Sequence, residues 1–207
     1  MGNKSILFFI NQLGRAVFTT REVAMMSGRS LSVTTQTLRY LEREGLVLKV
    51  YRGIWATTGK GNISPYSMIP FLFPRQRAYV SFVSALHLYG IIEQVPQVIM
   101  LASIAHTKVI TTKLGTFSVH RLAPLFFTGY DWYKGTGNFL IAEQEKAFVD
   151  SLYLSACKKK LYSYFPELHF PQNFRVEKVR MWSEKIPNPR IRGYVLRKLE
   201  GFDWRQV

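Results

Sequence analysis

Short polar side chains followed by arginines are predicted to share one face of a helix over residues 30–44. From helical spacing we expect four residues to face the core, namely Thr34, Thr37, Leu38 and Leu41. The opposite face then presents Ser32, Thr35, Gln36 and Arg39. Glutamine can bridge N6 and N7 of adenine, and a threonine methyl can pack on the C5 methyl of thymine. This face therefore predicts a helix that reads base edges in the major groove of double-stranded DNA.

Basic side chains around this helix are suited to phosphate contacts, which position a protein on DNA without reading its sequence. The residues expected to make such contacts are Arg21, Arg29, Arg43 and Lys49. Arg52 lies in a predicted tight turn with Gly53. Its side chain is expected to enter the minor groove or to lie along the DNA backbone.

The segment before the reading helix predicts two further helices and a short strand. Apolar spacing indicates a helix over residues 5–13, and β-branched residues predict a strand over 17–19. Thr20 is expected to cap the next helix without a capping box, because Val23 and not Glu or Gln lies three residues on. Gly28 is expected to end this helix. Its core face is expected to carry Val23, Ala24 and Met26.

A capped helix followed by a hairpin completes the amino-terminal pattern. Ser30 or Ser32 is expected to cap the reading helix, and Gly45 to end it. Residues 46–51 and 54–57 then predict two strands joined by a tight turn. Helices with a short connecting turn and a following hairpin predict a winged helix-turn-helix. The alternative is a winged helix that contacts another protein instead of DNA.

The charge supports a polyanionic partner. The chain has 207 residues, with 28 Lys and Arg against 13 Asp and Glu, for a net charge of +15. Residues 1–60 carry net +6, residues 61–157 net +2 and residues 158–207 net +7. A field of this sign attracts nucleic acid. The alternative is that the charge serves general solubility.

A basic tail could extend the contact to DNA flanking the operator. Its residues are Lys158, Lys159, Lys160, Arg190, Arg192, Arg197 and Lys198. The three lysines follow a predicted helix, where they would also complement the helix dipole. The other four lie on a predicted terminal helix, where they would also form a solvated face.

Composition predicts two α+β domains. Residues 59–65, of linker composition, indicate a boundary between domains 1–60 and 61–207. The second domain is expected to mix helices and strands and to end in helices. Its predicted helices cover residues 81–89, 143–156, 174–186 and 191–199. Its predicted strands cover residues 98–105, 108–112, 115–122 and 138–142.

Catalytic or metal chemistry is not indicated. Glu145, Lys146 and Asp150 lack the E-x-K order of many nucleases, and we expect them on a helix surface. A pair between Lys146 and Asp150 would contribute a few tenths of a kcal/mol. The four histidines lack metal-ligand spacing, and Cys157 has no base beside it in sequence. We expect no enzyme activity, no metal and no cofactor.

A membrane location is not indicated either. No apolar run approaches the roughly 18 residues that a membrane span needs. The single cysteine excludes an intramolecular disulfide framework. We therefore expect a cytoplasmic protein with no membrane partner.

Several segments resemble AbiEi-type antitoxins of bacterial abortive-infection E systems. LRYLEREGLVLKVYRGIWA resembles the recognition helix and wing of many bacterial transcription regulators. The segments SALHLYGIIEQVPQVI, GTFSVHRL, FFTGY and IAEQEKAFVDSLYL follow in the order and spacing of the AbiEi carboxy-terminal domain. The resemblance implies a winged helix-turn-helix followed by an antitoxin-like α+β domain with a helical basic tail.

The resemblance also implies a function and partners. The protein would repress its own operon by binding inverted repeats in the promoter, with two copies per operator and a monomer or weak dimer off DNA. It would oppose a nucleotidyltransferase-like toxin without forming a stable complex, as part of phage defence. Two other classes remain: a ligand- or protein-responsive winged-helix regulator unrelated to a toxin, and a nuclease or nucleotidyltransferase.

Overall fold

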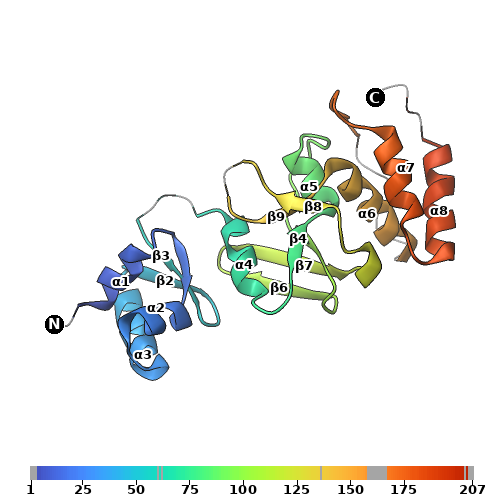
Figure 1. Ribbon diagram of the computed structural model, residues 1–207. Coiled ribbons are helices and arrows are strands. Elements are labelled where there is room, and N and C mark those ends of the chain that lie inside the picture. Colours follow the sequence, from blue (N-terminus) through green and yellow to red (C-terminus); the bar gives the residue numbers. More distant parts are fainter. Residues whose placement is uncertain are drawn as a thin grey trace. The chain divides into compact units, whose positions relative to one another are not determined.

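The chain forms two compact units (Figure 1). The computed structural model describes residues 4–59, 61, 63–135, 137–157, 167–202 and 204. The amino-terminal unit holds Met1–Pro74 with Thr111–Gly115, and the carboxy-terminal unit holds Arg75–Ile110 with Thr116–Val207. Both units combine helices and strands, which confirms the predicted α+β class. The domain boundary predicted between residues 60 and 61 stays a prediction.

The amino-terminal unit is a winged helix. Its elements are α1 (Ile6–Gln12), β1 (Val17–Thr19), α2 (Thr20–Ser27), α3 (Leu31–Arg43), β2 (Val47–Tyr51) and β3 (Ile54–Thr57). The strands form an antiparallel sheet in the order β1-β3-β2. Two short helices follow, η1 (Pro65–Met68) and α4 (Ile69–Leu72). The predicted order of three helices, a strand and a hairpin is confirmed.

One hydrophobic core joins the helices to the sheet of this winged helix. It consists of Ile6, Ile10, Phe18, Val23, Leu38, Leu41, Val47 and Trp55. The Trp55 indole is buried, and its Nε1 donates a hydrogen bond of 2.9 Å to Thr20 Oγ1. This bond joins the first residue of α2 to the central strand β3, so the helix that precedes α3 has a defined position on the sheet.

The cap of α2 differs from the prediction. Thr19, not Thr20, is the N-cap, and a capping box is present. Thr19 Oγ1 accepts from the backbone N–H of Glu22 (3.2 Å), and Glu22 Oε2 accepts from the backbone N–H of Thr19 (2.8 Å). Moving the cap back by one residue places Glu22 at the third helical position, which the box requires. Gly28 ends α2 in the left-handed conformation, as predicted.

The carboxy-terminal unit is built on a six-stranded mixed sheet in the order β6-β7-β5-β4-β9-β8. The strands are β4 (Ala78–Val80), β5 (Ile99–Ser103), β6 (Lys108–Thr112), β7 (Gly115–Arg121), β8 (Tyr130–Trp132) and β9 (Leu140–Ala142). The helices are α5 (Phe82–Leu88), η2 (Pro124–Phe126), α6 (Gln144–Cys157), α7 (Val176–Glu184) and α8 (Pro189–Glu200). The longer elements match the predicted ranges to within a few residues, whereas β4 and β8 were not predicted.

Helix α6 is the centre of this unit, packed against α5, α7 and α8 (Figure 1). Every residue from Glu145 to Ser155 is buried. The Phe148 ring also contacts the rings of Phe170, Phe174, Phe202 and Trp204. These contacts hold the segments that flank α7 and α8 against α6.

The prediction that Glu145, Lys146 and Asp150 lie on a helix surface is wrong. The side chains of Lys146 and Asp150 are fully buried and form an ion pair one helical turn apart. Asp150 Oδ2 also accepts hydrogen bonds from Ser81 Oγ (2.7 Å) and Tyr79 OH (3.2 Å). Lys146 Nζ lies 3.8 Å from the centroid of the Phe126 ring. The pair is buried because Tyr79 and Ser81 bond it on one side and Lys146 lies over the rings of Phe126 in η2 and Trp182 in α7.

Burial and pairing act in opposite directions on the titration of this pair. Burial lowers the pKa of Lys146, and the Asp150 carboxylate opposes that shift. Burial likewise raises the pKa of Asp150, which the Lys146 ammonium and the two hydroxyl donors oppose. Each charge is therefore tolerated in the core only because the other is present.

We predict that Lys146→Met lowers the free energy of unfolding by about 3–5 kcal/mol, because it leaves the buried Asp150 carboxylate without a counter-charge. Urea unfolding followed by circular dichroism measures the loss. The matched control is Lys178→Met, which removes the cation of the half-exposed pair with Glu143 and should cost less than about 1 kcal/mol. Equal losses in the two variants would contradict the importance of the buried pair.

We predict that Glu22→Gln lowers the stability of the amino-terminal unit by about 1 kcal/mol at pH 7 by weakening the cap of α2. Burial raises the pKa of Glu22, but the hydrogen bonds from Thr19 and the Arg15 guanidinium outweigh it, so the pKa lies below its usual 4.5. Such a carboxylate stabilises the fold above about pH 4.5 and loses this effect as the pH falls through the folded pKa. Thermal unfolding at pH 7 and pH 3 should show the difference from wild type shrinking in acid, and a constant difference would refute it.

Candidate nucleic-acid interface

The outward face of α3 carries the side chains predicted to read bases. Ser30 caps the helix by accepting the backbone N–H of Val33 (3.3 Å), so the helix begins at Leu31. The residues of α3 that are buried are Thr34, Leu38 and Leu41. Those that are exposed along the opposite side include Ser32, Gln36, Arg39 and Arg43. The fold thus exposes three of the four predicted base-reading residues, Ser32, Gln36 and Arg39, to solvent.

Thr35 and Thr37 lie at the margins of this face and are partly buried. The hydroxyl of Thr35 donates to the carbonyl of Leu31 (2.6 Å), and that of Thr37 donates to the carbonyl of Val33 (3.0 Å). Because its hydroxyl hydrogen is used within the helix, Thr35 has its methyl group left for contact with a partner. The expectation that Thr37 faces fully inward does not hold.

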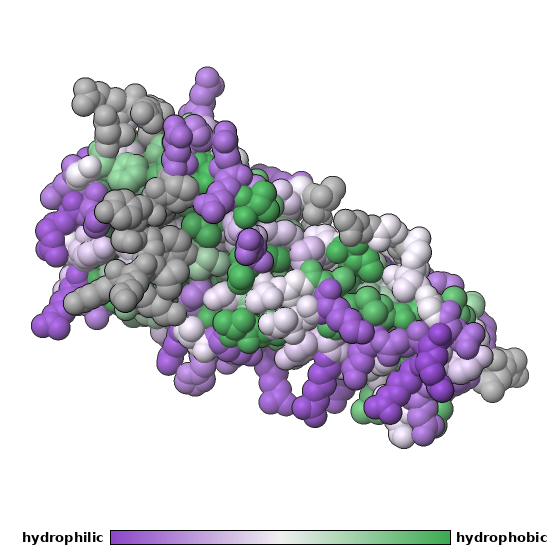
Figure 2. Space-filling view, turned by 180° about the vertical axis from the view of Figure 1, so that it is seen from behind, coloured by the Kyte–Doolittle hydropathy of each residue, from purple (hydrophilic) through white to green (hydrophobic). Residues whose placement is uncertain are grey.

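Some apolar side chains of the same unit are exposed, although the sequence pattern does not indicate their exposure. Leu31 is 52% exposed and Val33 47%, both in the first turn of α3. Met26, expected in the core, is 41% exposed, which corrects that expectation. Figure 2 shows hydrophobic side chains among the hydrophilic ones over this unit, at the right of the view. Position in the first turn of a reading helix is the one signal that would have found Leu31 and Val33.

Several arginines of this unit have no intramolecular counter-charge. Among the residues that the structure describes, Arg21, Arg39, Arg43 and Arg52 form no ion pair. All four are exposed, and Arg52 lies in the turn between β2 and β3, the tip of the wing. Uncompensated guanidinium groups on one small unit are free to bind the phosphates of a polyanion.

Of the two remaining residues predicted to contact phosphates, one has its side chain bonded within the fold. Arg29 is half-buried, and its Nη2 donates to the carbonyl of Lys4 (3.1 Å). Lys49 is half-buried on β2, and its backbone N–H donates to Glu42 Oε1 (3.0 Å). Arg29 thus contacts the segment that leads into α1, whereas the Lys49 ammonium has no ion-pair partner among the described residues.

The seven basic residues predicted to contact flanking DNA differ in their surroundings. Lys158, Lys159 and Lys160 lie outside the described residues. Arg190, Arg197 and Lys198 are exposed on α8, whose Val195 and Leu199 are buried. Arg192 is half-buried, and its Nη1 donates to the carbonyls of Glu184 (3.5 Å) and Ile186 (3.4 Å) at the end of α7. Arg192 thus satisfies carbonyls at a helix end, which is a structural contact.

Two findings on the described residues concern metal ions and membranes. Within ranges 4–59, 63–135, 137–157 and 167–202, no three His, Cys, Asp or Glu side chains come close enough to hold a metal ion. In the same part of the chain, no helix has the length and apolar character that a membrane crossing requires.

Comparison with known families places the amino-terminal unit. Residues 6–58 match the family model described as transcriptional regulator, AbiEi antitoxin. The match runs from α1 to the residue after β3, and over this region it confirms the resemblance to AbiEi-type antitoxins. No curated protein matches the chain. The winged helix is thus similar to that of a family of transcriptional regulators.

Proposed function

We propose that this protein is a sequence-specific DNA-binding repressor and the antitoxin of an AbiE-like toxin–antitoxin system. One observation carries the proposal. The outward face of α3 combines polar side chains that can bond base edges with arginines that form no ion pair among the described residues. That face belongs to a unit that matches a family of transcriptional regulators. A helix of this kind fits the major groove with its first turns against the base edges.

The side chains divide into two roles in this proposal. Ser32, Thr35, Gln36 and Arg39 read base edges from the exposed side of α3. Arg21, Arg43 and Lys49 contact phosphates, and Arg52 at the wing tip enters the minor groove or follows the backbone. Arg29 contributes less, because its guanidinium already bonds the Lys4 carbonyl.

The exposed apolar side chains of α3 add a preference for thymine. Leu31 and Val33 lie in the first turn of the helix, the part that approaches base edges most closely. With the Thr35 methyl they form an apolar margin beside the polar readers. The C5 methyl of thymine is the apolar group that the major groove offers to such side chains.

The family similarity of residues 6–58 supports a proposal for the biological role. We propose that two copies bind inverted repeats in the protein's own promoter and shut off transcription of an operon that also encodes a nucleotidyltransferase-like toxin. The carboxy-terminal unit would then counteract the toxin without a stable complex and without enzymatic activity of its own. Exposed Arg190, Arg197 and Lys198 on α8 would serve as contacts to flanking DNA.

A second candidate is a winged-helix regulator that responds to a ligand. A pocket of about 620 Å³ in the carboxy-terminal unit favours it. A cavity of this volume is of the size that holds small molecules in other proteins.

We predict that the protein shifts a fragment of its own promoter in a mobility assay, with a footprint over inverted repeats. Affinity should fall with salt by a log–log slope of about −0.9 for each neutralised phosphate. Arg52→Ala should flatten the slope by about one per protomer, because it removes one phosphate contact. Absent or salt-insensitive binding would remove the proposal.

The control for specificity is the double variant Gln36→Ala with Arg39→Ala. It should keep the fold, because both side chains are exposed, and lose the preference for the promoter over random DNA of equal length. Circular dichroism checks the fold of the variant. If the double variant still selects the promoter, the reading face is not the one assigned to α3.

We predict that replacing single thymines by deoxyuridine in the footprint weakens binding about fourfold at one or more positions of each half-site. The reason is that one methyl contact with Val33 or Leu31 is lost. Val33→Ala or Leu31→Ala should make the corresponding position insensitive to the exchange. Affinity that is uniform across all thymine-to-deoxyuridine exchanges would show that the apolar margin does not face the bases.

A further inference from the structure

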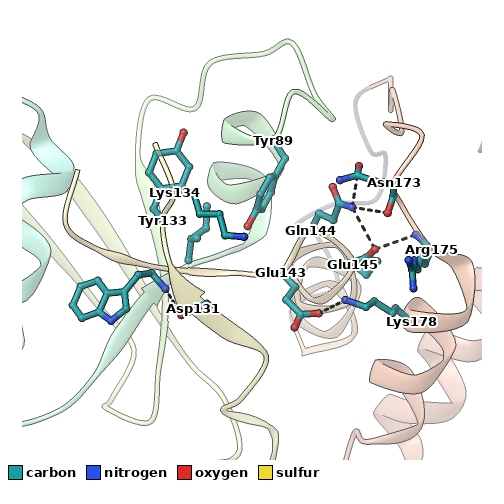
Figure 3. A pocket seen from close by; sticks show the side chains of 12 residues that line it. Tyr89, Asp131, Tyr133, Lys134, Glu143, Gln144, Glu145, Asn173, Arg175 and Lys178 are labelled. Carbon is teal, nitrogen blue, oxygen red and sulfur yellow. Dashed lines mark hydrogen bonds and ion pairs between the residues drawn. The ribbon is translucent and has the colours of Figure 1, made fainter. Parts of the chain in front are cut away.

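The pocket of the carboxy-terminal unit brings together residues from five elements or their flanks (Figure 3). Tyr89 comes from the end of α5, residues 131–134 from β8 and the turn after it, and Ile141 from β9. Residues 143–145 lie at the start of α6 or just before it, and Asn173, Arg175 and Lys178 lie at the start of α7 or just before it. Its volume is about 620 Å³. Neither the winged helix nor the family similarity assigns a role to it.

A buried carboxylate with one open oxygen lines the pocket. Glu145 is only 2% exposed. Its Oε1 accepts the backbone N–H of Arg175 (3.0 Å) and the side-chain amide of Gln144 (3.4 Å). Its Oε2 has no hydrogen-bond partner among the described residues. Glu145 Oε2 keeps contact with solvent inside the pocket, so it can accept a hydrogen bond from a ligand that supplies an N–H or O–H.

Aromatic rings form another wall of the same pocket. The Tyr89 hydroxyl donates to the carbonyl of Ala142 (2.8 Å), which fixes its ring. Burial, together with the carboxylates of Glu143 and Glu145, raises the pKa of Tyr89 to about 12, so this donor stays protonated. The Tyr133 ring is backed by Phe139 at 4.8 Å, and Trp132 is 55% exposed. Fixed and exposed rings of this kind can stack on a flat heterocycle.

The rim of the pocket is basic. Lys134 and Arg175 are exposed and form no ion pair with any residue that the structure describes. Lys178 is bound to Glu143 at 3.0 Å, so this pair contributes little net charge. Figure 3 shows Lys134 and Arg175 on opposite sides of the pocket. Two unpaired cations at the mouth suit an anionic group that remains close to solvent.

We propose that this pocket binds a purine nucleotide. The base would stack on the aromatic wall and donate its exocyclic amino group to Glu145 Oε2, and the phosphate would lie between Lys134 and Arg175. A nucleotide is the class of ligand that joins a flat ring, a hydrogen-bond donor and an anion in a molecule of this size. The site is independent of DNA binding by α3, so either can fail without the other.

Isothermal titration of the full chain with nucleotide pairs tests the assignment. AMP and purine riboside 5′-monophosphate differ only in the amino group, as do GMP and IMP. At least one amino-bearing nucleotide should bind about tenfold more tightly than its partner, as a hydrogen bond to a charged acceptor implies. The nucleoside without phosphate should also bind about tenfold more weakly. Failure of all four nucleotides to bind at millimolar concentration would overturn the proposal.

Variants locate the binding. Glu145→Gln keeps the shape of the side chain and should reduce the difference within the nucleotide pair, whereas Lys134→Ala and Arg175→Ala should each weaken every nucleotide severalfold. Arg175→Ala retains the backbone N–H that Glu145 accepts, so the fold of the pocket is preserved. Arg180→Ala is the matched control, because this exposed arginine is on α7 but does not line the pocket.

Two results would refute the assignment. Equal weakening by Arg180→Ala, or equal binding of ribose 5-phosphate and AMP, would show general attraction of anions to a basic protein. Binding of L-arginine in preference to every nucleotide would show that Glu145 accepts a cationic guanidinium instead of a base.

Discussion

The ion pair of Lys146 and Asp150 is the interaction on which the carboxy-terminal unit depends. It lies on α6, the helix covered by α5, α7 and α8, and it is bonded to β4 through Tyr79 and Ser81. Ser81 directly precedes Phe82, whose φ of 56° is rare for a residue with a bulky side chain. Such a conformation costs on the order of 1–3 kcal/mol and persists only where the surroundings hold it. The hydrogen bond from Ser81 to Asp150 and the burial of the Phe82 ring keep the backbone in this conformation. The strained residue is thus held in place by the ion pair and by core packing.

The winged helix is organised differently, around an apolar core and local caps. Trp55 fills the space between the sheet and the helices and bonds Thr20, so the start of α2 is tied to β3. The capping box of α2 and the left-handed Gly28 then set the short connection to Ser30, which begins α3. These contacts involve the inner face of α3 or residues that precede it in the chain. The outer face of α3 therefore takes no part in them. That freedom is what allows exposed Gln36 and Arg39 to serve a partner.

Periodicity was sufficient to predict most helices and the wing, because each of these segments spans at least one full repeat of its pattern. Strands β4 and β8 have three residues each, too few to show alternation. Thr19 and Thr20 are adjacent, and either residue type commonly caps a helix. The Thr20 hydroxyl accepts a hydrogen bond from Trp55 Nε1, so Thr19 is the residue that caps α2. The burial of Lys146 and Asp150 is not predictable from local sequence, since each charge alone indicates a surface and the side chains that enclose the pair come from distant segments. The exposure of Leu31 and Val33 has no sign in the sequence pattern, because apolar residues in a helix more often face a core.

Both units carry exposed cations that form no ion pair with a described residue, among them Lys134 and Arg175 of the carboxy-terminal unit. In the carboxy-terminal unit, Asp150 and Glu143 each hold a lysine, and Glu145 accepts a backbone N–H. In the winged helix, Glu22 engages Arg15 and Glu42 accepts the Lys49 N–H, which leaves four exposed arginines without carboxylate partners among the described residues. Duplex DNA gains most from such a surface, because many phosphates release counterions at once. A pocket of about 620 Å³ cannot admit a duplex, and a mononucleotide carries too few charges to compete for the arginines. Both proposed ligands carry phosphate. Size therefore keeps duplex DNA out of the pocket, and low charge keeps a mononucleotide from displacing DNA from the arginines.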